Sequence, residues 1–193
     1  MISIDARTRP VYEKSTKIGE HVFYVLQSTE LFGIIHMITT LLLTCNETFK
    51  ASAPLTACNP IVLPQTILSL TIFSIKVLNN TMRMDVGIAQ QLMLELNEQL
   101  YYLLSFILQY SEQNHDENDD VKELLHETLI FIGYFCLLNE GNQKTLHRGE
   151  NSILQKLCNL PFTFFMNKKQ NDILFPTLIT VGYLNERSVA IMD

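Results

Sequence analysis

The sequence predicts an all-α fold assembled from repeated helical units. Apolar residues recur at steps of three and four along much of the chain, whereas no stretch shows the strict alternation of a half-buried strand. Hydrophobic residues make up 47% of the 193 residues and charged residues only 18%, which indicates helices that are covered on several sides. A block of sequence also recurs, with Thr-Leu-Ile beginning once at Thr128 and again at Thr177. This recurrence is the main reason to expect repeated helical units.

The N-terminal half of the chain contains three predicted helices. Residues 1–20 form a poorly defined N-terminal segment in which no apolar stretch follows the charges, so no secretory signal is visible. Long apolar runs follow at 20–45 and 63–79, separated by a stretch with Pro, Ser and Asn. A third helix, amphipathic in its first half, is expected from residue 88 to about residue 110.

An acidic loop, 111–120, separates these helices from the C-terminal third of the chain. Its carboxylates, among them Asp119 and Asp120, lack the spacing of a calcium-binding EF-hand loop, so a solvated loop is favoured over a cation site. Further helices are predicted at 121–139, 151–166 and 171–185. Residues 21–193 thus form one helical repeat domain, in which the repeats are clearest at 121–193.

The recurring block defines one helix face and a small residue. Aligned on the two Thr-Leu-Ile sequences, Gly133 matches Gly182 and Tyr134 matches Tyr183. A glycine inside a helix costs about 1 kcal/mol relative to alanine, so two glycines at the same place need a reason. We expect them to mark the close approach of a neighbouring helix, and we expect all four residues to be structural.

The segment between the two copies supplies a second helix, with Asn151 or Ser152 as its N-cap. One repeat is then helix, turn, helix and turn, with a length close to that of armadillo and HEAT repeats. The sequence therefore predicts an armadillo- or HEAT-like solenoid. Because the second copy stops barely past its first helix, the chain is expected to be a fragment of a longer solenoid.

Two apolar runs raise the alternative of a helical membrane-associated protein, in keeping with a mean hydropathy of +0.13. Residues 31–45 form a short run, and 61–78 is interrupted by Pro64, Gln65 and Lys76. Both fall short of the roughly 20 uninterrupted apolar residues that cross a bilayer. Buried core helices are the favoured interpretation, and no membrane span is expected.

Composition and motifs argue against several classes of function. A net charge of −6 argues against nonspecific DNA binding. The common catalytic and nucleotide-binding signatures are missing, so we predict no enzyme and no cofactor or metal, with a helical enzyme of unrecognised type as a further alternative. Cys45, Cys58, Cys136 and Cys158 lack zinc-site or disulfide-framework spacing, which favours reduced, buried thiols and the cytosol. His36 is interpreted as a core histidine.

The turns that follow the repeat helices supply the candidate contacts with a protein partner, because the loops of stacked repeats are common binding faces. These turns are also ordinary polar turns, and that alternative stays open. The predicted contact residues are Asn142, Lys144, Arg148, Lys168 and Lys169.

Three blocks of the last third, in order, resemble a known family. They are "IGYFCLLNEGNQ", "ILQKLCNLPFTFF" and "ILFPTLI", which fall within 123–193. They are similar to the C-terminal helical region of the SCAPER family, the S-phase cyclin A-associated proteins of the endoplasmic reticulum. The resemblance implies an armadillo-type adaptor that acts by binding and not by catalysis.

The resemblance also implies partners and a location. Proteins of that family bind cyclin A, and in tubulin autoregulation they connect a ribosome-bound reader of nascent tubulin to a deadenylase complex that destroys the message. Their location implies a cytoplasmic protein associated with the endoplasmic reticulum. This sequence departs from the family in lacking its zinc finger and charged coiled coil, so zinc is not carried over. It also has Thr180, Val181 and Gly182 where the family runs to small residues and a cysteine.

Overall fold

The computed structural model contains only helices among the residues that it describes, so the predicted all-α class is confirmed. The described residues are 21, 24, 25, 33–52, 62–114, 118–148, 152–160, 164, 166 and 168–183. The elements are α2 (Gly33–Ser52), α3 (Gln65–Met84), α4 (Val86–Met93), the 3-10 helix η1 (Leu94–Leu96), α5 (Asn97–Asn114), α6 (Asp119–Cys136), α7 (Glu140–Leu146), α8 (Ile153–Cys158) and α10 (Lys168–Gly182).

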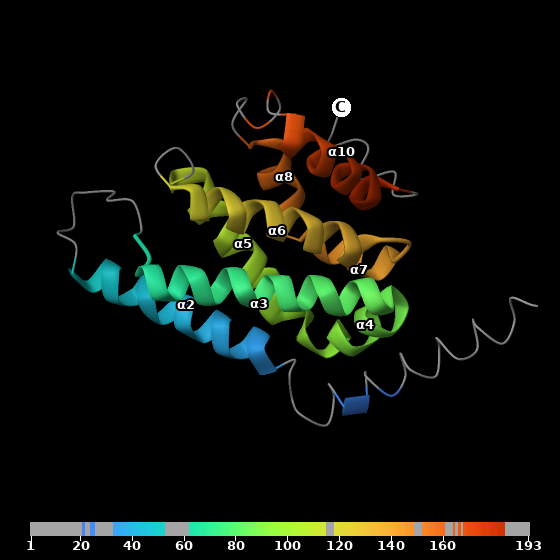
Figure 1. The fold of residues 1–193 in the computed structure, drawn as a ribbon, viewed down its shortest axis with the longest axis horizontal. Coiled ribbons are helices and arrows are strands. Elements are labelled where there is room, and N and C mark those ends of the chain that lie inside the picture. The colour runs from blue at the N-terminus through green and yellow to red at the C-terminus, as the bar shows by residue number, and fades with distance from the viewer. Residues whose placement is uncertain are drawn as a thin grey trace, which may run out of the picture.

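The helices are arranged in two layers. Helices α3, α6 and α10 lie one beside the next in the first layer, and α2, α5 and α8 form the second (Figure 1). The short helices α4 and α7 each follow a first-layer helix and lead the chain back towards the second layer. Apolar side chains of both layers meet between them, including the fully buried Phe131, Phe135 and Leu104. Segments about fifty residues apart in sequence are therefore neighbours in space.

Polar side chains fix α3 against α6. The amide of Asn79 donates to the main-chain oxygen of Glu127 at 2.9 Å and to its carboxylate at 2.8 Å. Elsewhere in the contact between α3 and α6, Lys76 Nζ lies 2.5 Å from Glu123 Oε1 at the surface. Because Asn79 is only 2% exposed, its two bonds hold the register of the helices more firmly than the screened surface pair does.

Each first-layer helix buries at least one small hydroxyl residue, and Ser74, Thr128 and Thr177 are three of them. Ser74 and Thr128 donate to the carbonyl four residues earlier in their own helices, at 2.7 Å in each case. Thr177 of α10 donates instead across to the carbonyl of Leu129 in α6, at 2.9 Å. The exposed fractions of the three residues are only 1%, 0% and 3%. A matching polar position therefore recurs along the layer.

The ends of the helices are set by side-chain caps. Asn151 or Ser152 was expected to cap α8. The cap is Ser152, which forms a capping box with Gln155, whose main-chain N lies 3.2 Å from Ser152 Oγ. Asp85 caps α4, and Asn118 caps α6 through the N–H of Asp120. Asn139 caps α7 in the same way. A side-chain oxygen at each cap satisfies an N–H that has no partner within its helix.

Several sequence predictions about helix boundaries were wrong. The run expected to end at residue 45 continues as helix, because α2 extends to Ser52. The single helix expected from 88 to about 110 is divided by η1, so that α4 and α5 are separate. The turn expected at 139–151 contains a helix, α7, whose polar residues are partly buried. In addition, α5 extends to Asn114 and α6 begins at Asp119, which leaves less of the acidic loop than 111–120 suggested.

Other predictions concern the apolar helices. None of the helices in the described ranges is long and apolar enough to span a bilayer. His36 was predicted to be a core histidine, but it is exposed on α2, so that prediction was wrong. The cysteine thiols of Cys45, Cys136 and Cys158 are free, and only Cys136 is fully buried, whereas Cys58 lies outside the described residues.

Candidate functional site

The contact between α6 and α10 is unusually close at Gly133. A Cβ atom placed on Gly133 would lie 3.2 Å from Thr177 Oγ1, which is tighter than an ordinary contact. Thr177 cannot easily withdraw, because its hydroxyl is bonded to the carbonyl of Leu129. At Gly133, α6 and α10 therefore approach closely. Gly182 is buried at the end of α10.

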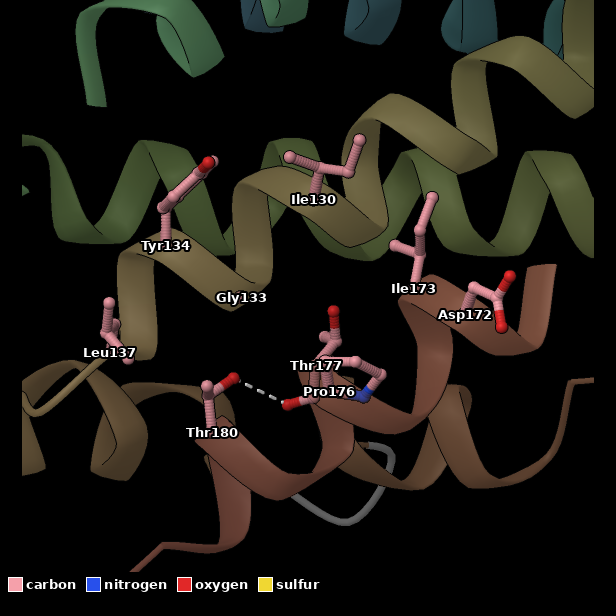
Figure 2. A pocket seen from close by; sticks show the side chains of 9 residues that line it. All are labelled: Ile130, Gly133, Tyr134, Leu137, Asp172, Ile173, Pro176, Thr177 and Thr180. Atoms are coloured by element: carbon pink, nitrogen blue, oxygen red, sulfur yellow. Dashed lines mark hydrogen bonds between the residues drawn. The ribbon is translucent and has the colours of Figure 1, made fainter. Parts of the chain in front are cut away.

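An open groove of about 240 Å³ lies between the same two helices. Figure 2 shows Ile130 across from Ile173 at one end of the groove and Leu137 near Thr180 at the other. The α6 wall consists of Ile130, Gly133, Tyr134 and Leu137, and the α10 wall of Asp172, Ile173, Pro176, Thr177 and Thr180.

The groove offers apolar surface with little free polarity. Both threonine hydroxyls are already engaged, Thr177 with Leu129 and Thr180 with the carbonyl of Thr177 at 2.8 Å. The carboxylate of Asp172 is exposed beside one end. Tyr134 is half-buried in the wall. This composition suits an apolar side chain presented by another molecule, since apolar pockets with few polar groups are the usual binding sites.

A buried glutamine holds the end of the α6 wall. The side-chain amide of Gln90, on α4, donates to the carbonyls of Tyr134 at 2.8 Å, Phe135 at 3.1 Å and Leu137 at 3.0 Å. Asn139 in turn donates to the side-chain oxygen of Gln90 at 3.0 Å. The last carbonyls of a helix have no partner within the helix, and Gln90 supplies one from outside. The C-terminal half of the groove is therefore rigidly supported.

A second buried glutamine makes similar hydrogen bonds near the ends of α6 and α10. Gln143, on α7, donates to the carbonyl of Thr180 near the end of α10 at 2.8 Å and to that of Cys136 at 3.3 Å. Its neighbour Asn142 donates to the carbonyl of Phe135 at 2.8 Å. The exposed fractions of Asn142 and Gln143 are 0% and 2%. Asn142 was predicted to contact a partner, and this placement corrects that prediction: its amide stabilises the C-terminal end of α6.

Two of the predicted contact cations lie on the surface in ion pairs. Lys144 Nζ is 2.7 Å from the carboxylate of Glu140. Arg148 bonds to the carboxylate of Glu98 on α5, and this hydrogen bond raises the pKa of its guanidinium. Its main-chain oxygen also accepts a hydrogen bond from the hydroxyl of Tyr101 at 2.8 Å. Exposed pairs of this kind are weak and exchange readily for a partner's carboxylates.

The remaining predicted residues lie on α10. Lys168 and Lys169 open this helix and are exposed, so they meet solvent at a different place from Arg148, which is bound to α5. Tyr183, expected to be structural like Tyr134, is 49% exposed at the end of α10. Sequence reasoning missed the groove itself, because its walls come from two helices that are far apart in the sequence.

Metal-binding side chains do not form a cluster among the residues that the structure describes. No group of three or more His, Cys, Asp or Glu side chains in these ranges has the geometry to hold a metal ion. Burial raises the pKa of the Cys136 thiol, which keeps it protonated and unreactive. What remains chemically distinctive is the apolar groove, with the exposed carboxylate of Asp172 at one end.

Comparison with known proteins tests the resemblance drawn from the three blocks within 123–193. No family model matches the chain. The human protein named "S phase cyclin A-associated protein in the endoplasmic reticulum" is 26% identical to it over 196 aligned residues, which cover 99% of this chain. The resemblance is confirmed and reaches well beyond those blocks into the first 120 residues. The chain is thus similar, along nearly its whole length, to a stretch of this human protein that amounts to 13% of it.

Proposed function

We propose that this chain is a non-catalytic adaptor that binds proteins through the first-layer surface. The observation that carries the proposal is the groove between α6 and α10, which is apolar, open and rigidly supported at its C-terminal end. A preformed site of this kind gains affinity because little ordering is needed on binding. The groove has room for roughly one large side chain, so it would anchor a segment of a partner and not enclose a small substrate.

An armadillo- or HEAT-like repeat underlies this proposal. Its support is that Asp85 and Asn139, 54 residues apart, cap the short helices α4 and α7, and that Ser74 and Thr128, also 54 residues apart, are buried in α3 and α6. Thr177 is buried in α10, 49 residues after Thr128. Gln90 and Gln143 lie at adjacent and not identical positions of this spacing, and each bonds to carbonyls near the end of the next first-layer helix, α6 or α10. Side chains that recur at a regular spacing are what stacked repeats produce.

The partners are proposed from the similarity to the human protein. Its name describes an association with cyclin A and a location in the endoplasmic reticulum. We extend both to this chain: a cytoplasmic adaptor, associated with the endoplasmic reticulum, that contacts cyclin A. The further roles that the resemblance implies, in ribosome-associated decay of tubulin messages with a nascent-tubulin reader and a deadenylase complex, are proposed as well.

The exposed cations are proposed as further contacts, at more than one place on the surface. Lys144, Arg148, Lys168 and Lys169 are all accessible. A partner carrying carboxylates would compete with Glu140 for Lys144 and with Glu98 for Arg148. Such competition costs little free energy at an exposed site. These cations would guide association, while the groove would supply the apolar anchor.

The test uses variants that leave the fold intact. Pro176→Arg places a long charged side chain at the groove and also removes an exposed proline from inside α10, so folding should not suffer. Leu94→Arg, on the half-exposed face of η1, is the matched control. A triple variant, Arg148→Glu with Lys168→Glu and Lys169→Glu, tests the cations.

Binding is measured with purified cyclin A and by affinity capture from cytosolic lysate, with ribosomal and deadenylase subunits identified by mass spectrometry. The proposal expects wild type and Leu94→Arg to bind at least one of these partners, Pro176→Arg to lose it, and the triple variant to associate more slowly. If wild type binds none of them, the partner assignment is wrong. If Pro176→Arg binds as well as wild type, the groove is not the site.

A further inference from the structure

The layer α3–α6–α10 ends in two exposed edges. On α10, the outer edge carries Ile179 and Tyr183, which are 65% and 49% exposed. On α3, at the opposite end of the layer, Leu70, Phe73 and Val77 are 38%, 65% and 37% exposed. Their spacing of three and four residues places them on one face of α3. Rows of large apolar side chains facing solvent mark interaction surfaces.

The two edges correspond to the two walls of the internal groove. From α6 to α10 the offset is 49 residues, as Thr128 and Thr177 show (177 − 128 = 49). Applied to the α6 wall, this offset carries Ile130 to Ile179 and Tyr134 to Tyr183. The outer edge of α10 therefore repeats the wall that α6 presents to α10.

The same holds for α3. The offset from α3 to α6 is 54 residues. The buried hydroxyl residues Ser74 and Thr128 are separated by this number (128 − 74 = 54). So are Asp85 and Asn139, the N-caps of the short helices that follow α3 and α6 (139 − 85 = 54). Moving from α10 to α3 therefore subtracts 54 + 49 = 103 residues. The wall residues Ile173, Pro176 and Thr180 of α10 map in this way onto Leu70, Phe73 and Val77 of α3.

We propose that copies of this chain stack head to tail, with the α3 edge of one copy against the α10 edge of the next. Ile179 and Tyr183 of one protomer then meet Leu70, Phe73 and Val77 of its neighbour, in the positions that Ile130 and Tyr134 hold against α10. The interface continues the layer that already exists within the chain. Ser74 and Gly182 are already buried, so the contact between copies is shallower than the one between α6 and α10.

The stacking is heterologous, because the two surfaces that meet are different. Such contacts generate open chains of molecules unless the rotation closes a ring. Assembly therefore depends on protein concentration and grows beyond a dimer. An isologous dimer, in which two α10 edges meet, would stop at two copies and would not involve α3.

Complementary variants of this 193-residue chain distinguish these arrangements. Ile179→Lys blocks the α10 edge and Phe73→Lys blocks the α3 edge, and both residues are exposed enough for the fold to tolerate lysine. Sedimentation velocity over a wide range of concentrations measures association, and circular dichroism checks folding. Each substitution should weaken self-association by about 30-fold or more, as loss of an interface anchor does. Leu94→Lys, away from both edges, should assemble like wild type.

The decisive sample is an equimolar mixture of Ile179→Lys and Phe73→Lys. Each variant alone remains monomeric, but the mixture forms a heterodimer and nothing larger, because each molecule keeps one working edge. The proposal is overturned if wild type stays monomeric at every concentration, or if the mixture gives no heterodimer. It is equally overturned if Ile179→Lys abolishes association while Phe73→Lys leaves a dimer, which is the isologous result.

Discussion

Gly133 of α6 and Thr177 of α10 approach so closely that the absence of a side chain on the glycine sets the distance between the two helices. A Cβ atom at Gly133 would lie 3.2 Å from Thr177 Oγ1, whose hydroxyl is bonded to Leu129. The width of the groove follows from this contact, because Ile130, Tyr134 and Leu137 stand on the same face of α6 as Gly133.

Gly133→Val should therefore destabilise the protein by about 2 kcal/mol, since overpacking a close helix contact typically costs 1–3 kcal/mol. Gly87→Val is the matched control: a Cβ there would meet only Asp85 Oδ1, at an ordinary 3.6 Å. Chemical denaturation of both variants measures the free energy of unfolding. Equal stabilities for the two would show that α6 and α10 are not held at this separation.

The buried glutamines support a second prediction. Gln90→Met keeps the length of the side chain but removes the donor from three carbonyls at the end of α6. Each lost bond to a buried group costs about 1 kcal/mol, so the free energy of unfolding should fall by about 2–3 kcal/mol. Gln91→Met, at the exposed neighbouring position on α4, should change stability little. A Gln90→Met variant as stable as Gln91→Met would mean that water replaces the glutamine.

The sequence predicted what depends on local pattern. The helix expected at 121–139 is α6, and the expected cap at Ser152 is present. Leu124 and Leu125, on the apolar face of α6, are each 1% exposed. These features follow from periodicity and from the hydrogen bonding of a hydroxyl to a free N–H, both of which are written in adjacent residues.

What the sequence did not predict depends on contacts between distant helices. Asn142 and Gln143 lie in a polar stretch that is typical of a turn, and nothing near them in sequence shows that their partners are carbonyls of α6 and α10. The break at η1 contains neither Gly nor Pro, so no local signal marked it. The groove belongs to the same class, because its two walls are more than thirty residues apart in sequence.

Acid should weaken the protein partly through two surface carboxylates. A hydrogen bond from Lys122 lowers the pKa of Asp119, and one from Lys144 lowers the pKa of Glu140. A carboxyl with a lowered folded-state pKa contributes stability above its unfolded pKa, about 4, and loses it as pH falls through the folded value. At neutral pH, wild type should therefore be more stable than the double variant Lys122→Met/Lys144→Met. This difference in stability should vanish in acid.

Melting curves over a range of pH measure this difference, with Lys168→Met as a control for the loss of a cation. Its difference from wild type should not follow the titration of Asp119 and Glu140. If the double variant kept a constant difference from wild type down to the lowest pH, the ion pairs would not be responsible for it.

Cys136 offers a way to follow the opening of α6. Its thiol is fully buried and burial raises its pKa, so the reactive thiolate is rare and inaccessible in the folded state. Cys45 and Cys158 are half-buried and free. Under native conditions iodoacetamide should modify these two first, and Cys136 only when the region around it opens. Mass spectrometry of the labelled peptides over time gives the three rates.

The same experiment connects the thiol to the groove. Gln143 donates to the carbonyl of Cys136 and to that of Thr180, so loosening α10 from α6 removes one of the supports around this cysteine. Gly133→Val should therefore speed the labelling of Cys136 by about 30-fold if the roughly 2 kcal/mol loss applies to the opening reaction. Gly87→Val should leave the rate unchanged. Rapid labelling of Cys136 in wild type, at the rate of Cys158, would show that α6 opens independently of its contact with α10.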